Sequence, residues 1–140
     1  MNHCIFHDIE ADRRDRRIFE IVEQAFSSND RVVIYAENAE RANSIDRTLW
    51  IIKQEAFIPH KIFQKQDADP GVPIAIVMEE INPIRAEILI SDGHCSLEFA
   101  MKFEATHEFV IRTSPEMQEI CRERFRSYRS RNIQVEYKKD

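Results

Sequence analysis

Apolar runs alternate with amphipathic stretches along the first half of the chain. The apolar-rich residues 2–9 predict a first strand, and residues 12–28 carry apolar side chains at helical spacing. The β-branched run Arg31–Ala36 (RVVIYA) is typical of a strand buried on both faces. Asn38 can cap a second amphipathic helix that extends through residues 50–52. This strand–helix–strand–helix order predicts a layered α/β fold with crossover helices.

The second half of the chain is less regular. Further strands are predicted by three apolar runs, at residues 74–78, 87–90 and 108–111. Residues 53–73 have no clean period, and Asp67–Pro73 (DADPGVP) predicts a turn or loop. Ser91–Phe103 is rich in apolar residues, but its pattern does not decide between helix and strand. Ile133–Tyr137 (IQVEY) alternates as a half-exposed edge strand would.

The stretch Ser114–Arg131 predicts a C-terminal helix. Ser114 suits the N-cap and Pro115 the first helical position. One face of this helix is apolar, with Phe125 at its edge, and comprises Met117, Ile120, Cys121 and Tyr128. Arg124 lies in the middle of that face, so it must either extend to solvent or pair with a carboxylate.

These elements predict a single domain over residues 1–140, with a three-layer α/β/α fold and a mostly parallel or mixed central sheet. We expect eight residues of the central strands to be buried: Val32, Val33, Ile34, Ile74, Ile76, Leu89, Phe109 and Val110. No apolar run approaches 18 residues, and MNHCIFHDIE does not resemble a signal peptide. We therefore expect a cytoplasmic protein, without a membrane partner and with reduced cysteines.

Glycine usage restricts the chemistry of this fold. The chain has only Gly71 and Gly93, and neither follows a strand in an arrangement that cradles phosphate. Nucleotide binding in a standard mode is therefore not expected, and no cofactor is expected. No metal site is predicted either, because on a strand His3 and His7 point to one side and Cys4 to the other.

One segment invites a catalytic interpretation. Asp92-Gly93-His94-Cys95 follows an apolar strand, where α/β enzymes often place catalytic groups. A small α/β thiol enzyme or hydrolase that uses Cys95 and His94 is therefore an alternative hypothesis. Adjacent residues in a turn seldom aim both side chains at one point, which favours a polar turn in which Cys95 begins a buried segment.

Positive charge is concentrated in the C-terminal helix. Residues 122–131 contain five arginines and one glutamate, a local charge of +4, in a chain whose net charge is −5. A polar, mostly basic stripe borders Phe125 and contains Gln118, Arg122, Arg126, Arg129 and Ser130. This stripe suits an acidic peptide with an apolar end, or it is an ordinary solvated face. The acidic pI near 5.6 argues against direct sequence-specific DNA binding, whereas stacking of single-stranded bases on Phe125 and Tyr128 is a further alternative.

Two segments together resemble a known family. Ile45–His60 joins a Leu-Trp helix end to a Phe-x-Pro-His stretch, and Ile120–Arg129 contains an Arg-Glu-Arg-aromatic helix. In this order and spacing they resemble the chi subunit family of the bacterial DNA polymerase III holoenzyme. The strand Arg31–Ala36, the size and the acidity agree with the resemblance, whereas residues 91–106 match poorly.

The resemblance implies a non-enzymatic adaptor in bacterial DNA replication, with a Rossmann-like architecture that has no nucleotide site. Members bind the acidic C-terminal tail of the single-stranded-DNA-binding protein, which ends in proline, phenylalanine and a free carboxylate. Arg122 matches the arginine that holds the tail, Phe125 replaces a tyrosine that walls the pocket, and Ile111 matches an aliphatic residue beside it. Gln118 stands where a lysine is expected, and Arg126 and Arg129 could compensate for the missing charge.

A second surface is implied by the same resemblance. In the family, it binds the psi subunit of the clamp loader, or an XPD-like repair helicase in some bacteria. Trp50 and Phe57 match positions on it, together with Ile58, Pro59 and His60. Without the resemblance, these large apolar groups could equally cover the core.

Overall fold

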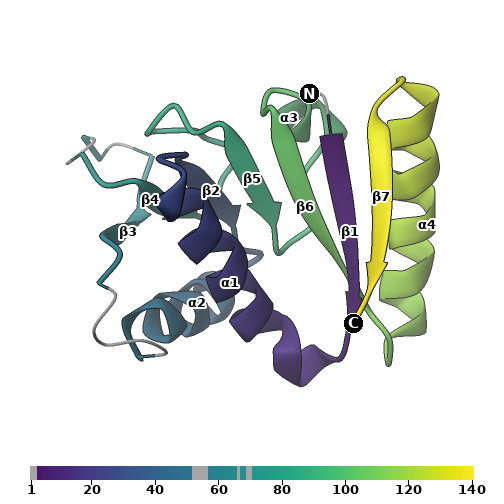
Figure 1. Ribbon diagram of the computed structural model, residues 1–140, viewed down its shortest axis with the longest axis horizontal. Helices are drawn as coiled ribbons and strands as arrows, with labels where there is room; N and C mark the ends of the chain where they lie inside the picture. The colour runs from purple at the N-terminus through teal and green to yellow at the C-terminus, as the bar shows by residue number, and fades with distance from the viewer. Residues whose placement is uncertain (1–2, 52–56, 66, 69–70) are drawn as a thin grey trace.

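A seven-stranded sheet forms the centre of the computed structural model, which describes residues 3–51, 57–65, 67–68 and 71–140 (Figure 1). The strands are β1 (His3–Ile9), β2 (Val32–Tyr35), β3 (His60–Phe63), β4 (Ile74–Val77), β5 (Ile88–Ser91), β6 (Ala105–Ile111) and β7 (Gln134–Lys139). Their order in the sheet is β3-β4-β2-β5-β6-β1-β7, and every pair is parallel. The α/β fold and the parallel sheet are thus confirmed.

Helices cover both faces of the sheet. They are α1 (Arg14–Ser27), preceded by the short 3₁₀ helix η1 (Ala11–Arg13), α2 (Ala39–Ile51), α3 (Leu97–Ala100) and α4 (Pro115–Ser130). One core cluster joins α1 and α2 to Ile34 and Phe109, and the other joins α3 and α4 to Val33 and Val110. Because side chains alternate along a strand, neighbours such as Val33 and Ile34 enter different layers. Figure 1 shows α1 in front of the sheet near β2, α2 toward β3, and α4 beside β7.

Most sequence predictions for the core and the helix ends are confirmed. All eight central-strand residues are buried: Val32, Val33, Ile34, Ile74, Ile76, Leu89, Phe109 and Val110. The Ser114 hydroxyl accepts the Met117 N–H at 3.2 Å, and the Asn38 side chain accepts the Arg41 N–H at 2.9 Å. Both residues therefore cap their helices as predicted.

Two irregular segments acquire structure that their patterns did not predict. The strand β3 lies at the end of residues 53–63. It is a strand because it pairs with β4, since its own sequence has no strand pattern. Within Ser91–Phe103 the chain makes a turn and then the short helix α3, whose N-cap Ser96 accepts the Phe99 N–H. The predicted second helix ends at residue 52, and this residue and residues 53–56 of the irregular stretch lie outside the described residues.

The strand β7 forms one edge of the sheet, next to β1, as predicted, but it is mostly exposed rather than half-exposed. Its residue Tyr137 lies in register with Phe6 of β1, and Asp8 of β1 lies in register with Val110 of β6. These pairs bring distant parts of the sequence beneath α4. Among the described residues, no helix is long and apolar enough to cross a membrane.

Candidate functional site

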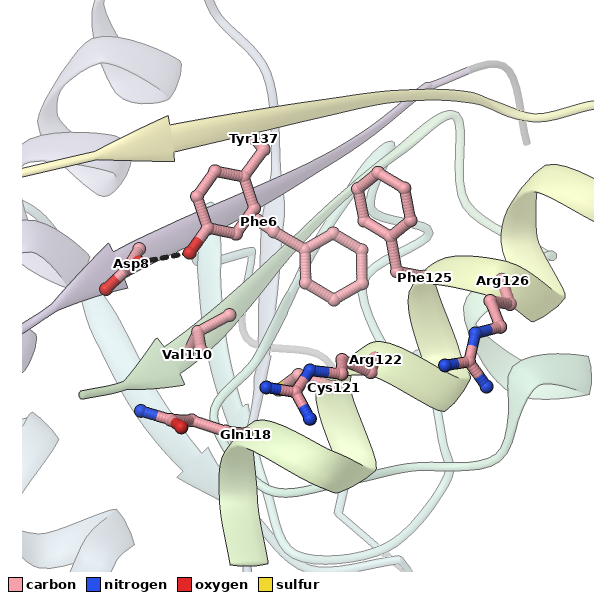
Figure 2. Close-up of a pocket in the computed structure, with 9 residues that line it drawn as sticks. All are labelled: Phe6, Asp8, Val110, Gln118, Cys121, Arg122, Phe125, Arg126 and Tyr137. Atoms are coloured by element: carbon pink, nitrogen blue, oxygen red, sulfur yellow. Dashed lines mark hydrogen bonds between the residues drawn. The ribbon is translucent and has the colours of Figure 1, made fainter. Parts of the chain in front are cut away.

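A cavity of about 440 Å³ lies between α4 and the last three strands of the sheet (Figure 2). Its lining is formed by Phe6, Asp8, Val110, Gln118, Cys121, Arg122, Phe125, Arg126 and Tyr137. The helix supplies one wall because residues 122, 125 and 126 follow residue 118 by four, seven and eight positions and so lie on one side of the helix. The strands supply the other wall through side chains that point toward α4.

Aromatic side chains form the apolar part of the cavity. The Phe6 and Phe125 ring centroids are 5.4 Å apart, and Phe6 also packs edge-on against Tyr128, with 6.0 Å between centroids. The Arg129 guanidinium lies 5.9 Å from the centroid of the Phe125 ring, a cation–π distance. A ligand ring entering here would therefore meet other rings and Val110 rather than water.

Two arginines provide positive charge at the cavity. The Arg122 side chain is 64% exposed and forms an ion pair with the similarly exposed Glu119, at 3.1 Å. Such a surface pair is weak, so it leaves the Arg122 guanidinium available to a stronger ligand. Arg126 is exposed and also lines the cavity. The two guanidinium groups can attract and hold a carboxylate.

The end of the cavity near Gln118 is polar. Asp8 accepts hydrogen bonds from the Tyr137 hydroxyl and from Arg112 Nε, the latter at 2.8 Å. The Gln118 amide donates to the backbone carbonyl of Arg112 at 2.5 Å. Gln118 therefore fixes the turn between β6 and α4, and its amide nitrogen is already engaged.

Arg124 meets a carboxylate inside the core, one of the two alternatives that its position predicted. Its Nη2 donates to Glu108 at 2.6 Å, and its Nη1 donates to the Cys95 carbonyl at 2.6 Å. The Tyr128 hydroxyl donates to the same Glu108 carboxylate at 2.7 Å. This buried network holds α4 against the sheet and so positions the helical wall of the cavity.

Two predicted placements on this side of the molecule are wrong. Ile111 does not lie beside Phe125 but packs with α1 and α2 on the other face of the sheet, because adjacent strand residues point to opposite faces. Val110 lines the cavity instead. Ile120 is 44% exposed rather than part of the buried face of α4, since that face narrows to Cys121, Arg124 and Tyr128.

The strand residues of the cavity were missed by sequence reasoning. Phe6, Asp8 and Tyr137 come from the two ends of the chain, and only the parallel register of β1 and β7 brings them together. The alternation within residues 3–9 already indicated that Cys4, Phe6 and Asp8 share a face. It gave no sign that this face lies under α4.

The two large rings at the end of α2, Trp50 and Phe57, are exposed, as predicted for a surface that binds a partner. Trp50 is 51% exposed and Phe57 is 57% exposed, and their ring centroids are 5.1 Å apart. Pro59 is half-buried beside them, whereas Ile58 is buried in the core. The buried His60 ring packs 4.8 Å from Trp50, with its Nδ1 at 2.7 Å from the Ile58 carbonyl. Ile58 and His60 therefore support this surface from below and are not offered to a partner.

The geometry around Cys95 does not suit a nucleophile. Its side chain is 2% exposed, and burial raises the pKa of the Cys95 thiol. Among the residues that the structure describes, neither ring nitrogen of His94 has a hydrogen-bond partner, so the imidazole does not activate the Cys95 thiol. Burial also lowers the pKa of His94. Cys95 is instead held in the core next to Ser91 and Arg124.

An ion-pair cluster occupies the crevice where α/β folds commonly bind nucleotides, at the carboxyl ends of β2 and β5. Arg41 donates to the buried Asp92 at 2.8 and 3.0 Å and to Asp15 at 2.6 Å. Burial tends to raise the pKa of Asp15, but hydrogen bonds from Arg41 and Ser44 lower it below its ordinary value. Within the described ranges, no group of three or more His, Cys, Asp or Glu side chains is placed to hold a metal ion.

The fold and the cavity thus define an α/β protein with an aromatic, arginine-edged binding pocket. Comparison with known proteins identifies its family. The family model of the DNA polymerase III chi subunit, HolC, matches residues 1–136. The chain is 28% identical over 116 residues to DNA polymerase III subunit chi of Escherichia coli (strain K12), which covers 82% of this chain and 78% of that protein. It is 24% identical over 116 residues to the same subunit of Pseudomonas aeruginosa, covering 83% and 79%.

The chain belongs to the DNA polymerase III chi subunit family. It is therefore a replication factor. Its relatives are the chi subunit of DNA polymerase III, which is an accessory subunit and not the catalytic one.

Proposed function

We propose that the cavity beneath α4 binds the acidic C-terminal tail of the single-stranded-DNA-binding protein. The proposal is supported by one juxtaposition above all, the Arg122 and Arg126 guanidinium groups beside the ring-lined interior formed by Phe6 and Phe125. The terminal phenylalanine ring would enter that interior, and its free carboxylate would meet Arg122. A guanidinium can hold a carboxylate through two parallel hydrogen bonds, which an ammonium group cannot do.

The aspartates that precede the terminal Pro-Phe need no fixed contacts in this proposal. Arg126 and Arg129, both exposed on α4, provide a positive field that attracts them. Such a field accelerates encounter and is screened by salt, whereas the contact at Arg122 is short-ranged. Tail binding should therefore contain a salt-sensitive and a salt-insensitive part.

The second surface, formed by Trp50, Phe57 and the exposed Ile51, would bind a protein partner in the replisome. We propose the psi subunit of the clamp loader or an XPD-like helicase for this role. Large exposed rings that pack on each other, with Ile58 and His60 fixed beneath them, have the composition of an interface core. The chain would thus act as a cytoplasmic adaptor that connects protein on single-stranded DNA to the clamp loader.

The tail site is tested by calorimetry with a peptide of several aspartates ending in Pro-Phe. Arg122→Ala should weaken binding by a few kcal/mol, because it removes one side of a desolvated charge pair. Amidation of the peptide carboxylate should weaken it as much, and Arg126→Ala should weaken it less and mainly reduce the salt dependence. Arg47→Ala, which removes the same charge from an exposed position on α2, is the control. Wild-type affinity in Arg122→Ala would rule out the site.

The second surface is tested by co-purification with psi or with the helicase. Phe57→Ala should reduce capture of the partner while the melting temperature stays nearly unchanged, since the ring is mostly exposed. Phe26→Ala removes the same side chain from an exposed position on α1 and should leave capture intact. A large loss of stability without any change in capture would show that Phe57 belongs to the core.

A further inference from the structure

A carboxylate lies inside the proposed tail site, where an anionic ligand would not be expected to tolerate one. Asp8 is buried and lines the cavity together with Arg122 and Arg126. Figure 2 shows Asp8 and Gln118 at one end of the group of lining residues and Phe125 and Arg126 at the other. The cavity therefore has a polar, negatively charged end and an aromatic, positively charged end.

The Asp8 carboxylate is held in its ionised form. Its Oδ1 accepts from Arg112 Nε at 2.8 Å, and its Oδ2 accepts from the Tyr137 hydroxyl. Burial tends to raise the pKa of Asp8, but these hydrogen bonds and the charge of Arg112 lower it below its ordinary value. Each carboxylate oxygen has a second lone pair, so the group can still accept a hydrogen bond from a ligand.

Arg112 does not cancel this charge from the ligand's side. The Arg112 guanidinium pairs with Asp8 and also lies 3.5 Å from Glu10, and Arg112 is not among the residues that line the cavity. A group bound in the cavity would thus contact Asp8, which lines it, and not Arg112. Like charges brought together in a partly desolvated site repel strongly.

We infer that Asp8 is a specificity-determining residue of this pocket, which excludes a carboxylate from the polar end and admits a neutral or hydrogen-bond-donating group there. The inference rests on the proposed binding of an acidic tail. It also explains how the bound peptide is held in one orientation in the cavity. Because the terminal carboxylate is repelled by Asp8 and attracted by Arg122 and Arg126, the ligand enters with its carboxylate toward the arginines.

The test uses three peptides that share their aspartates, the proline and a free terminal carboxylate. Their last residues are phenylalanine, 4-carbamoylphenylalanine and 4-carboxyphenylalanine, and the last two differ in charge but hardly in shape. The wild-type protein should bind the carbamoyl peptide about tenfold or more tightly than the carboxy peptide. Asp8→Asn should abolish or reverse this preference, because the arginines then attract the extra carboxylate without opposition.

Matched variants separate the local charge from other effects. Glu123→Gln removes one negative charge from an exposed position on α4 and should retain the wild-type preference. Tyr137→Phe keeps the charge of Asp8 and should also retain the preference for the carbamoyl peptide. This variant can be measured even if Asp8→Asn fails to fold. An equal or tighter affinity of the wild type for the carboxy peptide, or an unchanged preference in folded Asp8→Asn, would overturn the role of Asp8 alone. Failure of the phenylalanine peptide to bind would overturn the proposed tail site and this role with it.

Discussion

The guanidinium of Arg124 and the carboxylate of Glu108 lie 2.6 Å apart, and both groups are buried between α4 and the sheet. Tyr128, one turn further along the helix, donates to the same carboxylate. The two helix residues thereby connect α4 to β6 from within the core. The cavity side chains Arg122 and Phe125 flank Arg124 in sequence, so their position depends on this connection.

Replacing Arg124 with methionine should destabilise the protein by about 3–5 kcal/mol, because it leaves the buried Glu108 carboxylate without its partner. Urea unfolding measures the effect. The double variant Arg124→Met with Glu108→Leu should be more stable than Arg124→Met alone, since it removes both charges. A single variant as stable as wild type would mean that Glu108 finds another partner or takes up a proton.

The central part of the fold could be predicted because β-branched runs such as Arg31–Ala36 have few alternatives to a buried strand. The order of the strands could not, since it depends on which distant strands pair. The short edge strand β3 shows the same limit. His60–Phe63 has no pattern of its own, and pairing with β4 makes it a strand.

Only the helical half of the cavity could be predicted. Arg122, Phe125 and Gln118 lie on one side of a helical wheel, so their proximity follows from their spacing. The other half comes from β1 and β7, which are separated by more than a hundred residues in the chain and joined only by register. The resemblance implies that Ile111 lines the cavity, but side chains alternate along β6, so Val110 lines the cavity and Ile111 enters the opposite face of the sheet.

The stability of the protein should fall as the pH decreases from about 6.5 to about 4, because of two histidines, the buried His7 and the partly buried His107. Arg17 Nη1 lies 3.1 Å from His7 Nδ1, and His7 Nε2 lies 2.9 Å from His107 Nδ1, so both rings are held neutral. Burial, with the charge of Arg17, lowers the pKa of His7 from 6.5 to about 4, and burial, with His7, lowers that of His107 to about 3. The unfolded chain takes up these protons first, so acid favours unfolding.

His7 alone should account for a loss of roughly 3 kcal/mol over this range. Urea midpoints between pH 7.5 and 4 measure it. His7→Gln should flatten the dependence, whereas His3→Gln, at a half-exposed position on the same strand, should leave it nearly unchanged. The acidic groups with lowered pKa values contribute only at the lower end of this window and below it, because their ordinary values are 3.8 for Asp15 and 4.5 for Glu80. A flat wild-type profile from pH 6.5 to 4 would contradict the neutral histidine pair.

Gly93 should tolerate no side chain. A Cβ at this position would lie 3.0 Å from the backbone of Glu37, while the Gly93 N–H donates to the Tyr35 carbonyl at 2.9 Å. Gly93→Ala should therefore destabilise the protein by about 1–3 kcal/mol, as overpacking does. Gly71→Asn is the contrast, since Gly71 has a φ of +86° in open space and asparagine adopts positive φ more readily than other residues. Thermal unfolding should show the larger loss for Gly93→Ala, and equal losses would argue against the close approach of Glu37.

Gln118→Lys should change tail binding and stability in opposite directions. The new ammonium group would add a positive charge to the cavity beside Arg122, while the hydrogen bond from Gln118 to the Arg112 carbonyl would be lost. That lost bond should cost about 1 kcal/mol of unfolding free energy. The added charge should strengthen tail binding several-fold at low salt, and the gain should shrink as the salt concentration rises.

Gln118→Ala separates the two effects, because it removes the same hydrogen bond without adding charge. It should be as destabilised as Gln118→Lys but should bind the tail no better than wild type. Calorimetry at two salt concentrations, together with urea unfolding, gives two affinities and one unfolding free energy for each variant. If both variants gained equal affinity, the release of the turn between β6 and α4, and not the charge, would be what improves binding.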